Sequence, residues 1–291
     1  MNPNKKNIKP GAILKLKTVF QKHAWVVEDN SLNEASLFNR FCSILGELDE
    51  EQQEFIIELT NRFVWLRFEN YYKHFDFIFQ NILQSQTFSL NNITNIYFAP
   101  LILPEDKGKT KSSTMVLYML KGNNTLRYNA TYAQKLCKYF EDLDFDADLV
   151  NKQHSILFLV DDFIGTGETA STAINYLVNT TGVQQNKIVV LSIAAMKHGL
   201  EEVSNMGIKV FTAFEYDKGI SNYYPSHEAA EKLFLMKSIE NKLSPKVVKI
   251  NENERLGYRG SEALITLIRT PNNTFPVFWK QNKKRIAPFP R

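Results

Sequence analysis

Residues that build metal sites and disulfide frameworks are scarce in this sequence. Its 291 residues include two cysteines, Cys42 and Cys137, and five scattered histidines that form no ligand pair. The low cysteine count and the lack of zinc-type spacing exclude a disulfide scaffold or a zinc finger, and they indicate a reduced, cytoplasmic environment.

Long apolar runs and a strong net charge are also missing. No window is apolar for long enough to span a bilayer, and the first six residues contain no apolar signal core. We therefore expect no membrane association. The formal net charge is only +4, and the content of 44% hydrophobic and 23% charged residues is ordinary for a globular protein. Direct nucleic-acid binding is not expected to be the main activity.

Positive charge gathers only near the end of the chain, in a basic tail that we place at residues 281–291. Such a tail could contact nucleic acid or a phosphorylated partner. Prolines interrupt it, and we expect a solvated, partly disordered terminus. The basic residues of this cluster are Lys280, Lys283, Lys284, Arg285 and Arg291.

A strand, an acidic pair and a phosphate-binding turn follow one another in the middle of the chain. The apolar run Ile156–Val160 predicts a buried parallel strand, and Asp161 and Asp162 come directly after it. A turn rich in glycine and hydroxyl groups then leads into a helix predicted over 170–178. Backbone N–H groups at a helix start bind phosphate, and open α/β sheets bind ligands at the carboxyl ends of their strands. The pattern predicts a site for a ligand with hydroxyls and a phosphate, such as a ribose 5-phosphate.

Two other protein classes carry an apolar strand that ends in two acids. A response-regulator receiver would place its acids near the chain start, without a following Gly-Thr-Gly-Glu-Thr. A Walker B strand requires a phosphate loop upstream, and the nearest candidate is Gly108-Lys109-Thr110. That loop would need glycine at 103, where Leu103 is followed by Pro104, so the sequence excludes it.

Over Leu157–Thr169 the sequence resembles the fingerprint of the type I phosphoribosyltransferases: four apolar residues, two acids, two apolar residues, a spacer and Thr-Gly-x-Thr. The resemblance implies an α/β fold with a parallel sheet flanked by helices, and phosphoribosyl pyrophosphate (PRPP) or a nucleotide as ligand. It implies that Asp161 and Asp162 hold the ribose hydroxyls, lie next to a Mg2+ ion and are the catalytic acids. The ribose 5-phosphate would bind the turn Gly165, Thr166, Gly167, Glu168 and Thr169.

The sequence departs from this family at Gly165. Hypoxanthine-type members often carry an aspartate there, which can accept a proton, and glycine cannot. That role is either absent or supplied elsewhere.

The resemblance also implies two further groups of binding residues. The loop after the first core strand contacts pyrophosphate in the family, and its counterpart here is a lysine- and hydroxyl-rich loop that could equally be a solvated basic loop. A later strand is similar to the base-binding strand of purine members, although surface and core roles explain its residues as well. The pyrophosphate candidates are Lys109, Lys111, Ser112 and Ser113, and the base candidates are Lys197, Phe211 and Asp217.

The remaining pattern predicts four segments. An N-terminal helical region over 12–88 carries an aromatic stripe that we expect to pack as a helical layer on the sheet. The phosphoribosyltransferase-like core over 89–225 has further strands predicted at 96–103, 187–195 and 209–214, and helices at 115–120, 132–143 and 200–205. This alternation predicts a parallel sheet with right-handed crossovers. A C-terminal α+β extension covers 226–280, and the basic tail covers 281–291.

The extension contains Leu256–Ser261, a strand predicted over 263–268, and the motif Thr270–Trp279. That motif resembles a phosphoribosyltransferase-like subfamily associated with bacterial conflict and antiviral defence systems. The resemblance implies a toxic effector that acts at the anomeric carbon of a ribose phosphate, or an inactive PRPP or nucleotide sensor, or a regulatory subunit that docks an ATPase or a reverse transcriptase. Physically, Asn272, Asn273 and Thr274 could approach a ligand, cap the sheet or form a structural turn fixed by Pro271.

Overall fold

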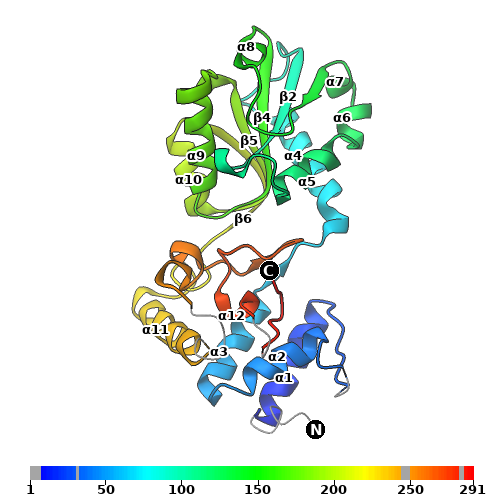
Figure 1. The fold of residues 1–291 in the computed structure, drawn as a ribbon. Helices are drawn as coiled ribbons and strands as arrows, with labels where there is room; N and C mark the ends of the chain where they lie inside the picture. Colours follow the sequence, from blue (N-terminus) through cyan, green and yellow to red (C-terminus); the bar gives the residue numbers. More distant parts are fainter. Residues whose placement is uncertain (1–7, 31–32, 244–249, 282–284) are drawn as a thin grey trace. The chain divides into compact units, whose positions relative to one another are not determined.

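The computed structural model describes residues 8–30, 33–243, 250–281 and 285–291. The chain forms two compact units (Figure 1). Unit 1 combines Met1–Leu66 with Asp217–Arg291, and unit 2 is the continuous stretch Arg67–Tyr216. No helix in the described part of the chain is both long and apolar enough to cross a membrane.

Unit 2 is built on a five-stranded sheet in which every neighbouring pair is parallel. The strand order is β3-β2-β4-β5-β6, so the fingerprint strand β4 is central. It is apolar and almost wholly buried before the acids, as expected for a parallel strand covered on both faces. The strands are β2 (Asn95–Pro100), β3 (Leu136–Tyr139), β4 (Ser155–Ile164), β5 (Ile188–Met196) and β6 (Lys209–Tyr216).

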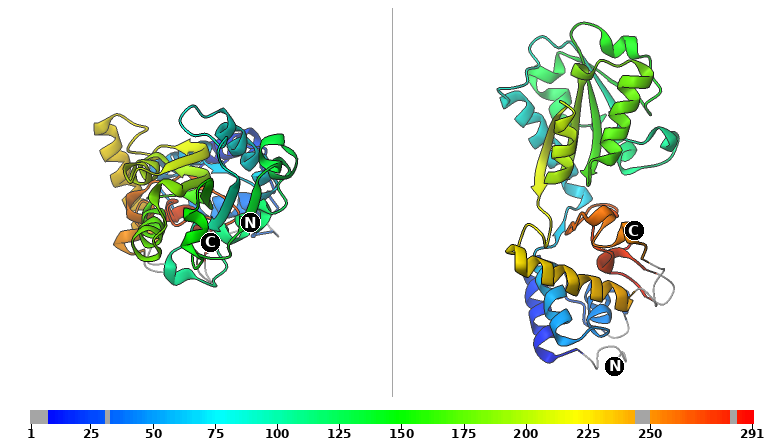
Figure 2. Two further views of the ribbon diagram at one scale, coloured as in Figure 1. Left: turned by 90° about the horizontal axis from the view of Figure 1, so that it is seen from above. Right: turned by 90° about the vertical axis from the view of Figure 1, so that its left-hand side faces the viewer.

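Helices cover both faces of this sheet (Figures 1 and 2). Tyr97 and Ala99 of β2 share a buried cluster with residues of α8, α9 and α10. Phe98, between them, points to the other face, where it contacts Phe79 of α4 with ring centroids 6.5 Å apart. The helices are α4 (Tyr71–Gln84), α5 (Ser112–Leu120), α6 (Asn124–Tyr128), α7 (Ala130–Ala133), α8 (Ala147–Asn151), α9 (Glu168–Tyr176) and α10 (Lys197–Asn205).

The parallel sheet flanked by helices is confirmed, whereas the helix predicted over 132–143 is wrong. That stretch contains the end of α7 and the edge strand β3, whose Leu136 and Cys137 pair with Asn95 and Ile96 of β2. Pairing with β2 decides the structure here rather than the local sequence pattern. An edge strand that is exposed on one face has few buried residues, so its alternation of apolar and polar residues is weak.

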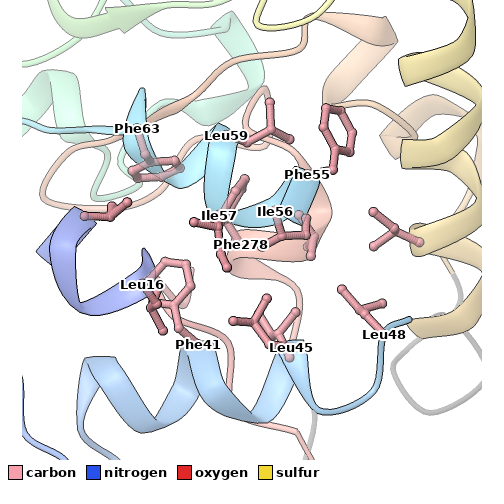
Figure 3. Close-up of a cluster of buried hydrophobic side chains, with 14 of the residues drawn as sticks. Leu16, Phe41, Leu45, Leu48, Phe55, Ile56, Ile57, Leu59, Phe63 and Phe278 are labelled. Carbon is pink, nitrogen blue, oxygen red and sulfur yellow. The ribbon is translucent and has the colours of Figure 1, made fainter. Parts of the chain in front are cut away.

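Unit 1 is mainly helical and contains one short parallel pair of strands. Its core joins the helices before unit 2 to the chain after it: Phe41, Phe63 and Phe278 lie in one buried cluster (Figure 3). The elements are α1 (Pro10–Lys22), α2 (Leu37–Leu45), α3 (Glu50–Asn61), β1 (Val64–Trp65), α11 (Ser226–Leu243), β7 (Ile265–Thr266) and α12 (Pro276–Trp279). Short 3-10 turns in the two units span Phe68–Asn70, Pro104–Asp106, Gln185–Lys187, Glu252–Glu254 and Tyr258–Gly260, and a π-turn spans Leu177–Thr181.

The contact units divide the chain differently from the four predicted segments. The aromatic helical region does not act as one layer, because α4 packs on β5 and β6 whereas α1 to α3 build their core with the C-terminal region. The contact units change after Leu66 and after Tyr216, and the boundaries near residues 88 and 225 stay predictions.

The end of the chain is packed rather than solvated. Phe289 is only 6% exposed and stacks on Phe63 with ring centroids 4.8 Å apart, and Arg285 is 5% exposed. The expectation of a solvated basic tail is wrong for Arg285 and for residues 287–289, which are buried, with Phe289 in the unit 1 core, whereas Ile286, Pro290 and Arg291 are exposed. Lys283 and Lys284 lie outside the described residues.

The Pro-Asn-Asn-Thr motif forms a structural turn in unit 1. The carbonyl of Asn273 accepts hydrogen bonds from Ser261 Oγ and the N–H of Ala263. Gly257 has a φ of +80°, and a Cβ there would lie 1.9 Å from the same carbonyl oxygen, so only glycine fits. The Trp279 indole N–H donates to the carbonyl of Thr274 at 2.7 Å. These bonds tie the two sequence motifs of the extension together.

Candidate functional site

The acidic pair lies at the carboxyl end of the central strand. β4 continues through both acids to Ile164, with Asp161 in register with Ser192 of β5. The strand in the structure is thus longer than the predicted strand, because its pairing with the neighbouring strand continues past the two acids.

Asp161 is held by the start of α5. Its Oδ1 accepts a hydrogen bond from Ser112 Oγ at 3.0 Å and one from the N–H of Asp162 at 2.8 Å. The residue as a whole is half-buried. Ser112 is the first residue of α5, so the loop expected to bind pyrophosphate is joined to the acidic pair through this serine.

Asp162 is held by the start of α4. Its Oδ2 accepts a hydrogen bond from the Tyr71 hydroxyl at 3.0 Å, and both residues are buried, with 4% of Asp162 and none of Tyr71 exposed. Sequence reasoning treated Tyr71 as part of an aromatic packing stripe. No local signal could have identified the contact, since the two residues are 91 positions apart.

Burial raises the pKa of both carboxyls. The pKa of Asp161 rises further because the charge of Asp162 lies beside it. Hydrogen bonds from Ser112 and Tyr71 oppose the rise in the pKa of Asp162 because they stabilise its ionised form. Two adjacent carboxyls of this kind favour a partner that supplies hydroxyl donors or positive charge.

The turn after β4 is shaped by glycines on two different segments. Gly167 precedes α9 with a φ of +83°, and a Cβ there would lie 2.8 Å from the carbonyl oxygen of Gly199. A Cβ on Gly199, in the first turn of α10, would lie 2.2 Å from the carbonyl oxygen of Gly165. α10 can approach the turn this closely only because both positions lack a side chain. The sequence showed Gly199 without any sign of this role.

The same turn presents groups that suit a phosphate. Thr166 is half-buried, Thr169 is exposed, and the N–H of Glu168 lies 3.5 Å from Thr166 Oγ1. The positive end of the α9 dipole and the N–H groups of its first turn favour an anion at this place. The turn and the acidic pair follow each other within one strand–turn–helix segment, so a single ligand can contact both.

The expected pyrophosphate residues differ in accessibility. Lys109 and Lys111 both form ion pairs at 2.8 Å with Asp106 and lower the pKa of its carboxyl. Ser113 is only 1% exposed and faces the interior. Ser112 is the member of this group that contacts the acidic pair.

Two of the expected base-binding residues, Lys197 and Asp217, directly follow the register partners Met196 and Tyr216, whereas Phe211 pairs with Leu191 earlier in the same two strands. Lys197 is exposed at the start of α10. Phe211 lies within β6, where its ring packs against Phe88 with centroids 5.8 Å apart. Asp217 belongs to unit 1, directly after β6 ends. Two aromatic residues lie nearer the carboxyl end of β6 than Phe211: Tyr216, and Phe214, whose ring meets that of His74 of α4 with centroids 4.9 Å apart.

The sequence model of the PRTase-CE family matches residues 47–291. The chain belongs to this family, which comprises phosphoribosyltransferase-like proteins of conflict systems. The match covers all of unit 2 and most of unit 1, including the packed C-terminal segment.

Two solved structures are similar to this PRTase-CE protein at low identity. Orotate phosphoribosyltransferase from Aeropyrum pernix is 13% identical, with a TM-score of 0.28, over 58% of this chain and 75% of that one. APRTase from Giardia lamblia, complexed with 9-deazaadenine, is 13% identical, with a TM-score of 0.29, over 51% of this chain and 78% of that one. No curated protein sequence matches the chain.

The oxygen groups of this PRTase-CE site fit Mg2+. Magnesium prefers oxygen ligands and is usually held by one or two carboxylates together with substrate phosphates. Asp161 and Asp162 supply two adjacent carboxylates. Across the described ranges, no group of three or more His, Cys, Asp or Glu residues could hold a metal by itself, so the phosphates of a ligand would complete the ion's coordination.

Proposed function

We propose that the protein binds PRPP, or a related ribose-phosphate nucleotide, at the end of β4 and acts at the anomeric carbon of the ribose as an effector in a conflict or antiviral defence system. The observation that carries this proposal is the order of groups along one segment: two adjacent carboxyls, then a glycine turn into α9. Membership of the PRTase-CE family supports the link to conflict systems.

In this proposal Asp161 and Asp162 accept hydrogen bonds from the ribose hydroxyls, and the turn from Gly165 to Thr169 binds the 5-phosphate. These contacts fix the ring while the bond between the anomeric carbon and the pyrophosphate breaks and the acceptor nucleophile forms a bond to that carbon. Water is this nucleophile when no other acceptor is present. The nearby carboxylates stabilise the positive charge that develops on the ribose. A bound Mg2+ ion would neutralise charge on the departing pyrophosphate. Lys109 and Lys111 would have to break their ion pairs with Asp106 before they could bind the pyrophosphate.

A second candidate function is a sensor that binds the same ligand without transfer and signals to a protein partner, such as an ATPase or a reverse transcriptase of a defence operon. Gly165 favours it, because no side chain at this position of the turn can accept a proton.

The purified protein incubated with PRPP and Mg2+ tests both candidates. Release of pyrophosphate or ribose phosphate, abolished by combining Asp161→Asn with Asp162→Asn, is the result expected for the enzyme. Thermal stabilisation by PRPP without any release would identify the sensor. If neither the wild type nor any variant at the site shows release or stabilisation, the ribose-phosphate site itself is refuted.

A further inference from the structure

Each carboxyl of the acidic pair is engaged by a hydroxyl group of the protein. Ser112 Oγ donates to Asp161 Oδ1, and Tyr71 Oη donates to Asp162 Oδ2, both at 3.0 Å. The two donors come from the first residues of two different helices, α5 and α4. Two hydroxyls on two adjacent carboxyls form the same hydrogen-bond pattern that the neighbouring hydroxyls of a ribose would make.

We propose that the Tyr71 and Ser112 hydroxyls are internal substitutes for the two ribose hydroxyls, so that a ribose phosphate binds by exchanging its hydroxyls for those of the protein. This inference rests on the proposed function, because it takes the acidic pair as the ribose site. Ligand entry then requires the starts of α4 and α5 to move away from β4, and the two contacts restrain access to the site.

The two contacts differ in the barrier they pose. Asp161 is half-buried as a residue and is less deeply enclosed than Asp162. Asp162 is 4% exposed and the Tyr71 ring is fully buried, so a ligand reaches Asp162 only after Tyr71 moves. Tyr71 is therefore the main restraint and Ser112 the smaller one.

The start of α4 is suited to such a movement. Its N-cap residue Asn70 has a helical conformation and makes no side-chain capping bond, and the first turn contains no acidic residue. The 3-10 turn Phe68–Asn70 holds this start instead, because the N–H of Asn70 donates to the carbonyl of Arg67 and the N–H of Tyr71 donates to the carbonyl of Phe68. The hydrogen bonds of a 3-10 turn have poorer geometry than those of an α-helix. By contrast, α3 begins with a complete capping box between Asp49 and Gln52. Two aromatic neighbours, Phe68 and Tyr72, are 46% and 42% exposed, and the Phe68 ring meets the Tyr71 ring edge-on with centroids 5.5 Å apart.

The direction of the effect distinguishes exchange from simple support. If the tyrosine merely positioned Asp162, removal of its hydroxyl would weaken ligand binding. In an exchange, the wild type loses the hydrogen bond from Tyr71 to Asp162 when it gains one from the ribose. The Tyr71→Phe variant gains the hydrogen bond from the ribose and loses none. A hydrogen bond to a charged group then tightens binding about tenfold. For Ser112→Ala we expect the same sign and a smaller effect, about two- to threefold, because Asp161 is the less buried residue of the pair.

The test is calorimetric titration of the full-length protein with ribose 5-phosphate. Tyr71→Phe and Ser112→Ala are compared with wild type, and Tyr132→Phe is the matched control. Tyr132 is also fully buried in unit 2 and donates to a backbone carbonyl, that of Phe79, at 2.9 Å. We expect tighter binding for the first two variants and unchanged binding for the control. Should Tyr71→Phe fail to fold, the Ser112→Ala result decides.

Deoxy sugars locate the exchanged hydroxyl. Two sugars are compared, 2-deoxyribose 5-phosphate and 3-deoxyribose 5-phosphate. Tyr71→Phe should still tighten the binding of the sugar that keeps the hydroxyl that reaches Asp162, and should not tighten the binding of the sugar that lacks it. An equal gain with all three sugars would mean that the variant only loosens α4, and it would overturn the exchange.

The outcomes separate this inference from the proposed function. If wild type binds ribose 5-phosphate and both variants bind it equally or more weakly, the exchange is refuted and the ribose-phosphate site stands. If only the variants bind, the restraint is supported in its strongest form. If no form of the protein binds ribose 5-phosphate or PRPP, the proposed site fails and the exchange fails with it.

Discussion

The two units of this protein hold their cores together in different ways. In unit 2 much of the core follows the order of the sequence. The strands β4, β5 and β6 are consecutive along the chain and adjacent in the sheet, and the helices α9 and α10 connect them. In unit 1 the core joins segments from the two ends of the chain. The ring of Phe63 stacks on that of Phe289, 226 positions later along the sequence.

This difference explains where sequence patterns are informative. A parallel strand buried on both faces has an apolar run, and a following helix has its own period, so each part of unit 2 can be recognised locally. A surface that is completed by a segment from the far end of the chain carries no local sign of its partner.

Tryptophan fluorescence separates the units experimentally. The three tryptophans, Trp25, Trp65 and Trp279, all belong to unit 1, and the sequence of unit 2 contains none. Denaturation followed by this fluorescence reports unit 1, while hydrogen exchange measured by mass spectrometry assigns stability to segments of either unit.

The largest effect is expected from Phe289→Ala. Replacing a buried phenylalanine with alanine costs about 3–5 kcal/mol, because both the burial of the ring and its packing contacts are lost. The fluorescence transition of unit 1 should shift to a lower denaturant concentration, with the exchange of unit 2 segments unchanged. Ile286→Ala is the control, since Ile286 is 44% exposed. Equal midpoints for Phe289→Ala and wild type would contradict the packed C-terminal segment.

A pH effect of similar size is expected in unit 1. Glu240 is fully buried, and burial raises its pKa from 4.5 to about 7. An acid whose pKa is higher in the folded state binds its proton more tightly when folded, so stability is greatest below pH 4.5 and falls as the pH rises through 7. The loss approaches about 3 kcal/mol at 1.36 kcal/mol per pKa unit.

Glu240→Gln should remove this pH dependence. The amide oxygen can still accept the hydrogen bond that the N–H of Leu256 gives to the carboxyl at 3.0 Å. Free energies of unfolding from tryptophan fluorescence at several pH values between 4 and 8 provide the measurement, with the exposed Glu231→Gln as control. A wild-type stability that rises from pH 5 to pH 7 while Glu240→Gln stays flat would reverse the assignment.

Much of unit 2 could be predicted from the sequence. The strand that ends in Asp161 and Asp162, the turn into α9 and the parallel sheet were all predicted from local pattern and from the family resemblance. The edge strand β3 was not, because Leu136 and its neighbours are placed by pairing with β2 rather than by their own pattern. Tyr71 could not be assigned to the site either, since a buried tyrosine in an aromatic stripe looks the same whether or not its hydroxyl meets a carboxyl.

A smaller effect is expected from Gly199→Ala in unit 2. Alanine in a helix interior is favoured over glycine by about 0.8–1.0 kcal/mol, so helix propensity alone predicts stabilisation. The new Cβ would instead lie 2.2 Å from the carbonyl oxygen of Gly165, and this overpacking costs about 1–3 kcal/mol. We expect net destabilisation and weaker binding of ribose 5-phosphate, with faster hydrogen exchange over the turn. The control is Glu201→Ala, which raises the propensity of the same helix at an exposed position.

The smallest effect, with the opposite sign, is expected from Gly11→Ala in unit 1. Gly11 lies in α1, has no atom within 4 Å of an added Cβ and does not require a positive φ. Alanine there restricts the unfolded chain more than glycine does and stabilises the folded unit by about 0.5 kcal/mol. The fluorescence midpoint of unit 1 should rise slightly. A fall would mean that α1 needs the freedom of glycine at its start. Opposite signs for Gly11→Ala and Gly199→Ala would show that glycine is replaceable in α1 and fixed by close backbone contact beside the fingerprint turn.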